Sequence, residues 1–321
     1  MLGAGLGNLA MARGGAAQRA DYPNRPVVLV VPYPPGGATD MLGRMVAQGL
    51  AGRLGGTFVT ENRPGAATIL GARSVARMRP GDGHTLLLGT NSTFAVNPVL
   101  FADAGYDPLQ DFLPVSVVAD TPFVLTVLPS RGWRSLADVV AAAKARPGVL
   151  TYASAGTGGM PHMTTEIFRE RAGVELVHVP YRGGTQAQID LLGGRIDLYF
   201  DTIAGAKSHV AAGRILALAV SSAGRQPAMA DVPSVAELGY PGFDVVGWFG
   251  LAAPAGTPTP VHAALEHAVT ATMEEPVNRA LLAELSLTPT ALGAGVMQRR
   301  MLDDQQLYAG IIHRANIRPD G

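Results

Sequence analysis

Two glycine-rich segments, each lying between a short apolar run and a helical pattern, constrain the fold of this chain most strongly. The first glycine loop, Pro32–Asp40, follows the apolar run Val27–Val31. The second glycine loop, Ala153–His162, follows Leu150–Tyr152. Glycine permits sharp turns and close approach of the backbone to a ligand, and a helix that begins just beyond offers unpaired N–H groups to an anion. Because the loops are far apart in the chain, we expect two domains that each contribute one loop to a shared cleft, as in a receptor for a small anion.

Composition is that of an ordinary globular protein of two domains. The chain has 321 residues, of which 47% are hydrophobic and 16% charged, and its 25 basic and 25 acidic residues balance. This balance gives no broad basic face for nucleic acid or for an anionic membrane. The chain has no cysteine, which excludes disulfides, thiolate metal sites and cysteine nucleophiles. A lipid anchor on an N-terminal cysteine is excluded on the same ground.

The first 21 residues stand apart from the rest of the chain. They resemble the second half of a secretory signal, although no positive charge precedes the apolar stretch; a disordered tail is the alternative. Gly5–Ala10 fits a dinucleotide-binding fingerprint by spacing. Because that fingerprint needs a preceding strand and the chain has barely begun, we expect no cofactor site there.

From Tyr22 onward, strand-like and helix-like segments alternate, which predicts an α/β fold with mostly parallel strands. We expect strands at 27–31, 57–60, 85–88, 115–119, 123–128, 150–153, 176–179, 196–200 and 215–220, with one long strand or a strand pair at 243–253. We expect helices at 41–54, 69–78, 136–145, 163–172, 186–192, 203–212, 260–272, 276–285 and 296–313.

The chain is predicted to leave its first domain near residue 119 and to return near residue 243. Residues 22–119 with 243–321 then form one domain, and residues 120–242 form the other. Two short crossings of this kind are typical of binding proteins that close about a hinge.

The first glycine loop supplies the first group of candidate ligand-binding residues. Its N–H groups from Gly36 to Asp40 would face an anion at the carboxyl end of a strand, where α/β sheets place ligands. Alternatively, the loop is a stiff turn in which Thr39 or Asp40 caps the next helix. The candidates here are Pro35, Gly36, Gly37, Ala38, Thr39 and Asp40.

The second glycine loop is expected to offer bare backbone donors at Gly156, Gly158 and Gly159, together with the hydroxyl groups of Ser154 and Thr157. His162 either hydrogen-bonds the ligand or only holds the loop, and the second role is the more common one for a single histidine. The candidates are Ser154, Ala155, Gly156, Thr157, Gly158 and His162.

Polar residues at the ends of two other predicted strands complete the candidate site. Thr90 and Asn91 follow one strand, and Asp201 follows another, so all three are placed to line a cleft. Asp201 would hold a water or pair with a ligand amine, or would simply be the N-cap of the next helix.

Catalytic motifs are absent from the sequence. There is no serine-hydrolase elbow, no H-E-x-x-H zinc motif and no lysine at the end of either glycine loop. Ser154, His162 and Asp201 could be imagined as a nucleophilic group, but nothing in the sequence fixes their geometry. An enzyme that acts on an anionic metabolite in the same cleft remains the alternative, with His162 or Asp201 as its base.

Neither glycine loop contains a lysine or an arginine, and Arg44 lies one turn beyond the first loop. An anion held by neutral donors and helix dipoles is more often a carboxylate than a polyphosphate, for which such loops normally add a lysine.

From Tyr22 to about Arg318, the chain resembles the Bug receptors, the solute-binding proteins of tripartite tricarboxylate transporters. The resemblance is carried by short motifs in one order along nearly the whole chain. These are Tyr22–Pro26, Val31–Asp40, Glu61–Ala66, Tyr106–Pro108, Ala153–Gly159, His178–Gly184 and Trp248–Pro258.

This resemblance implies a two-domain, Venus-flytrap fold of the periplasmic-binding class. It implies a small carboxylate ligand held between the two glycine loops, partly through ordered water. It also implies a location in the periplasm and the membrane permease subunits of a transporter as partners. We further expect a monomer without cofactor or metal.

Overall fold

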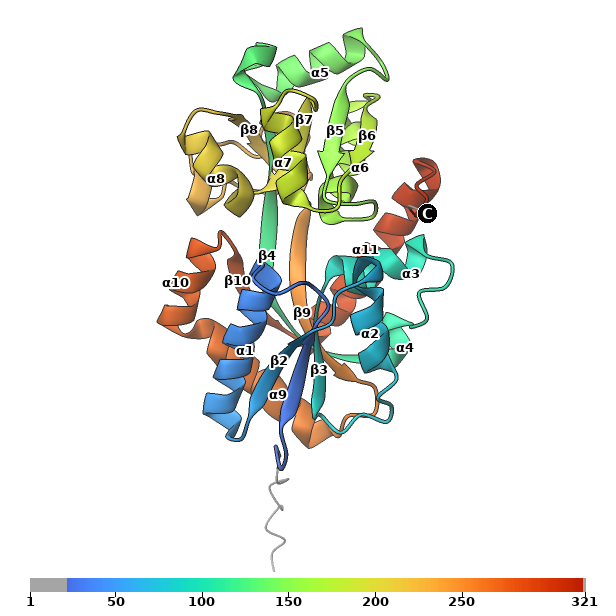
Figure 1. Cartoon of the computed structure of the whole chain (residues 1–321), viewed down its shortest axis with the longest axis vertical. Helices are drawn as coiled ribbons and strands as arrows, with labels where there is room; N and C mark the ends of the chain where they lie inside the picture. The colour runs from blue at the N-terminus through green and yellow to red at the C-terminus, as the bar shows by residue number, and fades with distance from the viewer. Residues whose placement is uncertain (1–21, 320–321) are drawn as a thin grey trace, which may run out of the picture.

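The computed structural model describes residues 22–319 (Figure 1). The predicted signal or tail at residues 1–21, with its Gly5–Ala10 fingerprint, lies outside the described residues. The structure has two lobes, one above the other in Figure 1, with β strands passing between them.

The first lobe, the lower one in Figure 1, is built around a parallel core of β1, β2 and β3. Its strands are β1 (Val27–Val31), β2 (Phe58–Asn62), β3 (Thr85–Thr90), β9 (Val246–Pro254) and β10 (Thr288–Gly293). Its helices are α1 (Ala38–Leu54), α2 (Ile69–Ala76), α3 (Asn97–Leu100), α4 (Pro108–Asp111), α9 (Thr259–Glu274), α10 (Pro276–Glu284) and α11 (Ala294–Arg314). Its short turns are η1 (Ala66–Thr68) and the π-helical η2 (Ser92–Val96).

The second lobe repeats this arrangement around parallel β5, β6 and β7. Its strands are β5 (Thr151–Ser154), β6 (Val177–Pro180), β7 (Leu198–Thr202) and β8 (Leu216–Val220). Its helices are α5 (Leu136–Ala145), α6 (Met160–Ala172), α7 (Gly184–Leu192) and α8 (Ile203–Ala211), with short turns η3 (Pro129–Arg131) and η4 (Pro227–Met229).

Strand β4 (Phe112–Val127) belongs to both lobes. Its first part, up to Pro122, pairs with β9 and β10, and its second part, from Phe123, pairs with β7 and β8. Strand β9 returns the chain to the first lobe. The order of strands in the sheet is β2-β1-β3-β9-β4-β7-β5-β6, with β8 and β10 paired to β4. The predicted two-domain α/β fold with two crossing segments is therefore what the structure has.

Two predictions about the strands were wrong. The expected strands at 115–119 and 123–128 are one continuous strand, because Pro122 lies at the crossing, where the partner of β4 changes, and does not end the strand. The sheet is also less parallel than expected, with four parallel pairs against five antiparallel ones among the described residues. The crossing strands cause this, since they run against the strands of both lobes. Strand β10 was not predicted.

The apolar cores follow the two lobes, with one exception. A cluster of buried residues joins Val96, Leu100, Tyr308 and Ile311 of the first lobe to the side chains packed around α6 of the second. Helix α11, which belongs to the first lobe, thus packs against both lobes. Among residues 22–319, no helix has both the length and the apolar character needed to cross a membrane.

Candidate functional site

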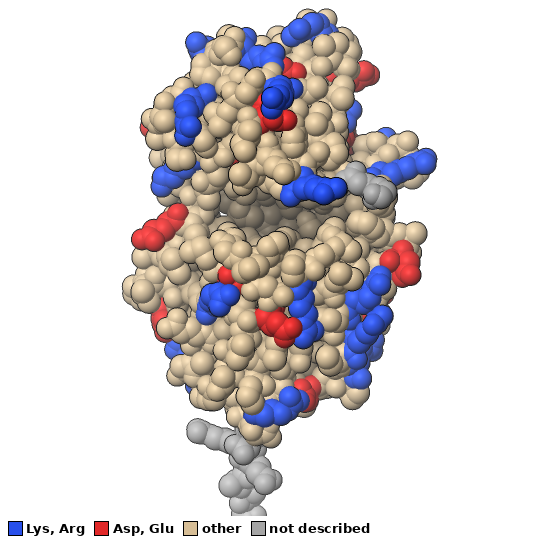
Figure 2. Space-filling view, viewed as in Figure 1, with Lys and Arg blue, Asp and Glu red and all other residues tan. Residues whose placement is uncertain are grey.

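A hollow lies between the two lobes in the space-filling view (Figure 2). The carboxyl ends of the parallel strands β1, β2 and β3 lie at the end of the first lobe that faces the second (Figure 1). The loop after β5 lies at the opposing end of the second lobe. Both glycine loops therefore border this interlobe cleft, as the sequence predicts.

The first glycine loop ends where α1 begins. Gly37 is the N-cap of α1, and the N–H groups of Ala38, Thr39 and Asp40 fall in its first turn, where a helix has no acceptors of its own for them. Pro35, Gly36 and Gly37 are exposed. A Cβ atom added to Gly36 or Gly37 would meet nothing within 4 Å, so the backbone here is open.

Asp40 does not cap the helix and instead holds the loop. Its carboxylate accepts hydrogen bonds from the Gly36 N–H at 3.0 Å and from Asn62 Nδ2 at 3.0 Å, and it pairs with Arg44 at 3.1 Å. These bonds, the one from Gly36 foremost, lower the pKa of Asp40 below its usual value. The side chain is buried. The alternative in which Thr39 or Asp40 is the N-cap is therefore wrong.

The second glycine loop is held by a histidine that sequence reasoning did not single out. His178 Nε2 lies 2.7 Å from Ser154 Oγ, and the His178 ring stacks on that of His162 at 3.8 Å between ring centres. Ser154 Oγ accepts from the Gly156 N–H at 3.2 Å, and His162 Nδ1 accepts from the Gly158 N–H at 3.1 Å. Ser154 and His162 are buried, so both support the loop from beneath.

This arrangement corrects the expectation of bare backbone donors along the second loop. The N–H groups of Gly156 and Gly158 are used inside the loop, and the Gly159 N–H donates to the Gly156 carbonyl at 3.0 Å. Pro161, in the first turn of α6, has no N–H to offer. Ala155 is exposed and Thr157 is half-buried.

His162 is uncharged at neutral pH. Burial, with smaller effects from His178 and Arg169, lowers its pKa from 6.5 to about 3. The neutral ring leaves Nδ1 free to accept the Gly158 N–H. Its other nitrogen, Nε2, lies 3.8 Å from Glu166 Oε1.

Thr90 and Asn91 lie at the carboxyl end of β3, as predicted. Thr90 Oγ1 is 2.8 Å from the Tyr33 hydroxyl, which ties the end of β3 to the first glycine loop. Asn91 is fully buried and donates to Met160 Sδ at 2.7 Å, at the start of α6 in the other lobe. Asn91 therefore lies at the contact between the lobes.

Asp201 lies near the carboxyl end of β7 and is buried. Its carboxylate accepts from Gln188 Nε2 at 3.0 Å and from the Thr202 N–H at 2.7 Å. Burial raises its pKa to about 7. The N-cap of α8 is Thr202, whose side chain accepts from the Gly205 N–H, so the interpretation of Asp201 as the cap is wrong.

The structure does not arrange the imagined nucleophilic group. The histidine beside Ser154 is His178 rather than His162, and Asp201 is bonded to Gln188 and Thr202. Within the described part of the chain, no group of three or more His, Asp or Glu side chains is placed to hold a metal ion. The arrangement suits binding through backbone N–H groups.

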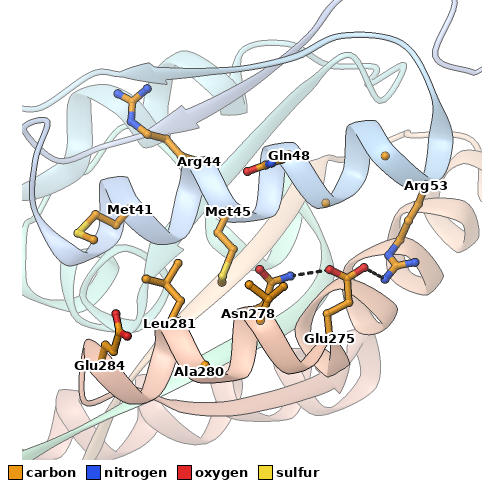
Figure 3. Close-up of a pocket in the computed structure, with 13 residues that line it drawn as sticks. Met41, Arg44, Met45, Gln48, Arg53, Glu275, Asn278, Ala280, Leu281 and Glu284 are labelled. Atoms are coloured by element: carbon orange, nitrogen blue, oxygen red, sulfur yellow. Dashed lines mark hydrogen bonds and ion pairs between the residues drawn. The ribbon is translucent and has the colours of Figure 1, made fainter.

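A separate groove of about 870 Å³ lies between α1 and α10 (Figure 3). Met41, Met45 and Leu281 line it, and an ion pair between Arg53 and Glu275 lies at one end. None of the predicted site residues lines it.

Comparison with known proteins identifies the family of this chain. Residues 42–317 match the family model described as "Tripartite tricarboxylate transporter family receptor". The chain belongs to this family. The protein BugT of Bordetella pertussis is 35% identical over 292 residues, which cover 91% of this chain and 89% of that protein.

Solved structures agree with this assignment. The R. palustris protein Rpa4515, solved with adipate, is 37% identical with a TM-score of 0.82, over 94% of this chain and all of that chain (100%). MatC of Rhodopseudomonas palustris, solved with bound malate, is 30% identical with a TM-score of 0.78, over 91% of this chain and 100% of that one. The resemblance to the Bug receptors and the periplasmic-binding fold are thereby confirmed.

Proposed function

We propose that this protein is a periplasmic receptor that binds a small carboxylate in the interlobe cleft and delivers it to the membrane subunits of a tripartite tricarboxylate transporter. The observation that carries the proposal is the exposed segment Pro35–Gly37, which leads into the first turn of α1 at the cleft in a chain of this receptor family. Relatives solved with adipate and malate support a carboxylate as the ligand.

In this proposal, the two loops have different tasks. The N–H groups of Gly37, Ala38 and Thr39 bind the carboxylate, and Asp40 keeps the loop in shape through Gly36. The second loop covers the ligand from the other lobe. The proposed site consists of residues that contact the ligand or position the loops that do: Pro35, Gly36, Gly37, Ala38, Thr39, Asp40, Thr90, Asn91, Ser154, Ala155, Gly156, Thr157, Gly158, His162 and Asp201.

We further propose that the protein acts as a monomer, with residues 22–119 and 243–321 moving as one domain and residues 120–242 as the other. The change of partners along β4 between Pro122 and Phe123 lies close to the first boundary, with Asp120–Pro122 still paired to β9. Closure about the two crossings would bring the second loop onto a ligand seated at α1.

A thermal-melt screen of the full chain against dicarboxylates, tricarboxylates, acidic amino acids, aromatic carboxylates and nucleotides tests the function. A ligand at about 100 times its Kd adds roughly 2.7 kcal/mol to the free energy of unfolding and raises the melting temperature clearly. Stabilisation by one class of carboxylate supports the proposal. Stabilisation by nucleotides alone contradicts it.

The substitution Gly37→Val tests the proposed binding site directly. Gly37 has φ −84° and ψ 173°, which valine adopts readily, and the space around it is open, so we expect the fold to be kept and carboxylate binding to be lost. Gly156→Val is less suitable, because Gly156 has φ +130° and any side chain there strains the backbone. Normal binding by a folded Gly37→Val protein would contradict the site.

A further inference from the structure

The connection between β2 and α2 has an unusual backbone. Gly65 has φ +130°, and the next three residues, Ala66, Ala67 and Thr68, have φ values of 45°, 51° and 80°. L-amino acids disfavour this left-handed region, and glycine or asparagine normally fills such positions. Three successive non-glycine residues in it indicate a conformation that the surrounding structure imposes.

Buried polar groups hold this left-handed turn, residues Gly65–Thr68, in place. Asn97 Nδ2 donates to the Ala67 carbonyl at 2.6 Å and to Thr68 Oγ1 at 3.1 Å. Thr68 Oγ1 also lies 3.0 Å from Thr93 Oγ1, and both threonines are buried. The turn is therefore anchored from beneath, while Ala66 and Ala67 are exposed above it.

The left-handed turn adjoins the first glycine loop. Strands β1 and β2 are parallel neighbours, so the segments that follow them lie at the same edge of the sheet. Asn62, the last residue of β2, donates to the Tyr33 carbonyl at 3.1 Å and to Asp40. Gly71 of α2 packs so closely on Pro32 that an added Cβ would lie 2.7 Å from the Pro32 side chain.

The same turn is linked to the second glycine loop through α3. Asn97, which holds the turn, is the first residue of α3, and Leu100 is the last. Leu100 packs on Gly158, where an added Cβ would lie 2.4 Å from Leu100 Cδ2. One short helix thus supports the left-handed turn and contacts the opposing loop, which places the turn at the border of the cleft.

We propose that the left-handed turn is a third wall of the binding cleft and limits the length of the carboxylate through the methyl groups of Ala66 and Ala67. This inference rests on the proposed function. The two exposed side chains are small, apolar and uncharged, so they suit the hydrocarbon part of a ligand whose carboxylate is held at α1. An ordinary solvent-facing connection needs neither the strained alanines nor the buried network beneath them.

The test compares affinities for succinate, glutarate, adipate and pimelate by titration calorimetry. Asparagine tolerates a left-handed backbone, so Ala67→Asn adds bulk to the cleft without unfolding the turn. In Ala67→Asn, we expect the affinity for the longest acid that the wild type binds to fall about tenfold more than the affinity for the shortest acid, because the added side chain overfills the pocket. Ala67→Gly should shift the preference toward longer acids.

Ala291→Asn is the matched control, because Ala291 also has a positive φ, 41°, but lies in β10. Its profile should equal that of the wild type. If Ala66→Asn and Ala67→Asn both keep the wild-type profile while Gly37→Val loses binding, the third wall is wrong and the proposed function stands. If the wild type binds no carboxylate in the melt screen, the proposed function fails and this inference falls with it.

Discussion

At the scale of single residues, the Nδ1 atom of His162 connects the core of the second lobe to the second glycine loop. It accepts the Gly158 N–H at 3.1 Å inside a buried stack with His178. We expect His162→Phe to lower carboxylate affinity about tenfold, because phenylalanine keeps the ring but leaves that N–H without an acceptor, at about 1–3 kcal/mol. His162→Asn, whose Oδ1 can replace Nδ1, should bind nearly as the wild type. Calorimetry checks the pair, and equal affinities would show that the bond does not position the loop.

The same histidine should make stability depend on pH. Its pKa is 6.5 in the unfolded chain and about 3 in the fold, so below pH 6.5 the unfolded state takes up a proton that the folded state does not. The contribution of His162 to the free energy of unfolding is fully present above pH 6.5. It decreases as the pH is lowered, by about 2 kcal/mol at about pH 5. Urea unfolding at a series of pH values measures it. The His162→Asn variant cannot take up this proton, so its free energy of unfolding should decrease less as the pH is lowered. If the two proteins lost stability in parallel, His162 would not be the group responsible.

At the scale of elements, helix α3 transmits packing from one lobe to the other. Leu100 of α3 is buried against Gly158, so Leu100→Ala should lower the free energy of unfolding by about 2–4 kcal/mol and also weaken carboxylate binding. Leu265→Ala removes a fully buried leucine from α9, in the core of the first lobe, and should cost stability alone. Urea unfolding and calorimetry on both variants separate the two effects. Equal affinities would mean that the α3 contact does not support the second loop.

The elements also show where local sequence suffices. Helix α5 was predicted with both of its ends, and at its N-terminus Ser135 and Asp138 form a capping box, which is a local signal. The continuity of β4 could not be predicted, since Pro122 marks a strand end in any local pattern and only the distant β9 shows that the strand continues. The positions of both glycine loops followed from the strands before them. The supports from Asn62 and His178 did not, because each lies over 20 residues from its loop partner.

At the scale of the whole molecule, the lobes meet at more than the two crossing strands. To one side, α11 packs on α6, where Tyr308 and Met160 are in contact and Arg314 pairs with Glu170 at 2.9 Å. On the other side, α8 lies above α10 in Figure 1. These contacts predict that the cleft closes by a rotation of one lobe relative to the other. During this rotation α6 stays in contact with α11, and the distance between α8 and α10 changes.

Spin-label distances can test this rotation, because the chain has no cysteine and labels attach only where cysteines are introduced. Lys207→Cys with Val277→Cys spans α8 and α10, and Arg171→Cys with His313→Cys spans α6 and α11; all four positions are exposed. We expect a bound carboxylate to shorten the first distance and to leave the second unchanged, since closure is driven by contacts that both lobes make with the ligand. If the distance between α6 and α11 changed as much as the distance between α8 and α10, the axis of rotation would lie at the crossing strands alone. The contact of α11 with α6 would then open and close with the cleft instead of acting as its pivot.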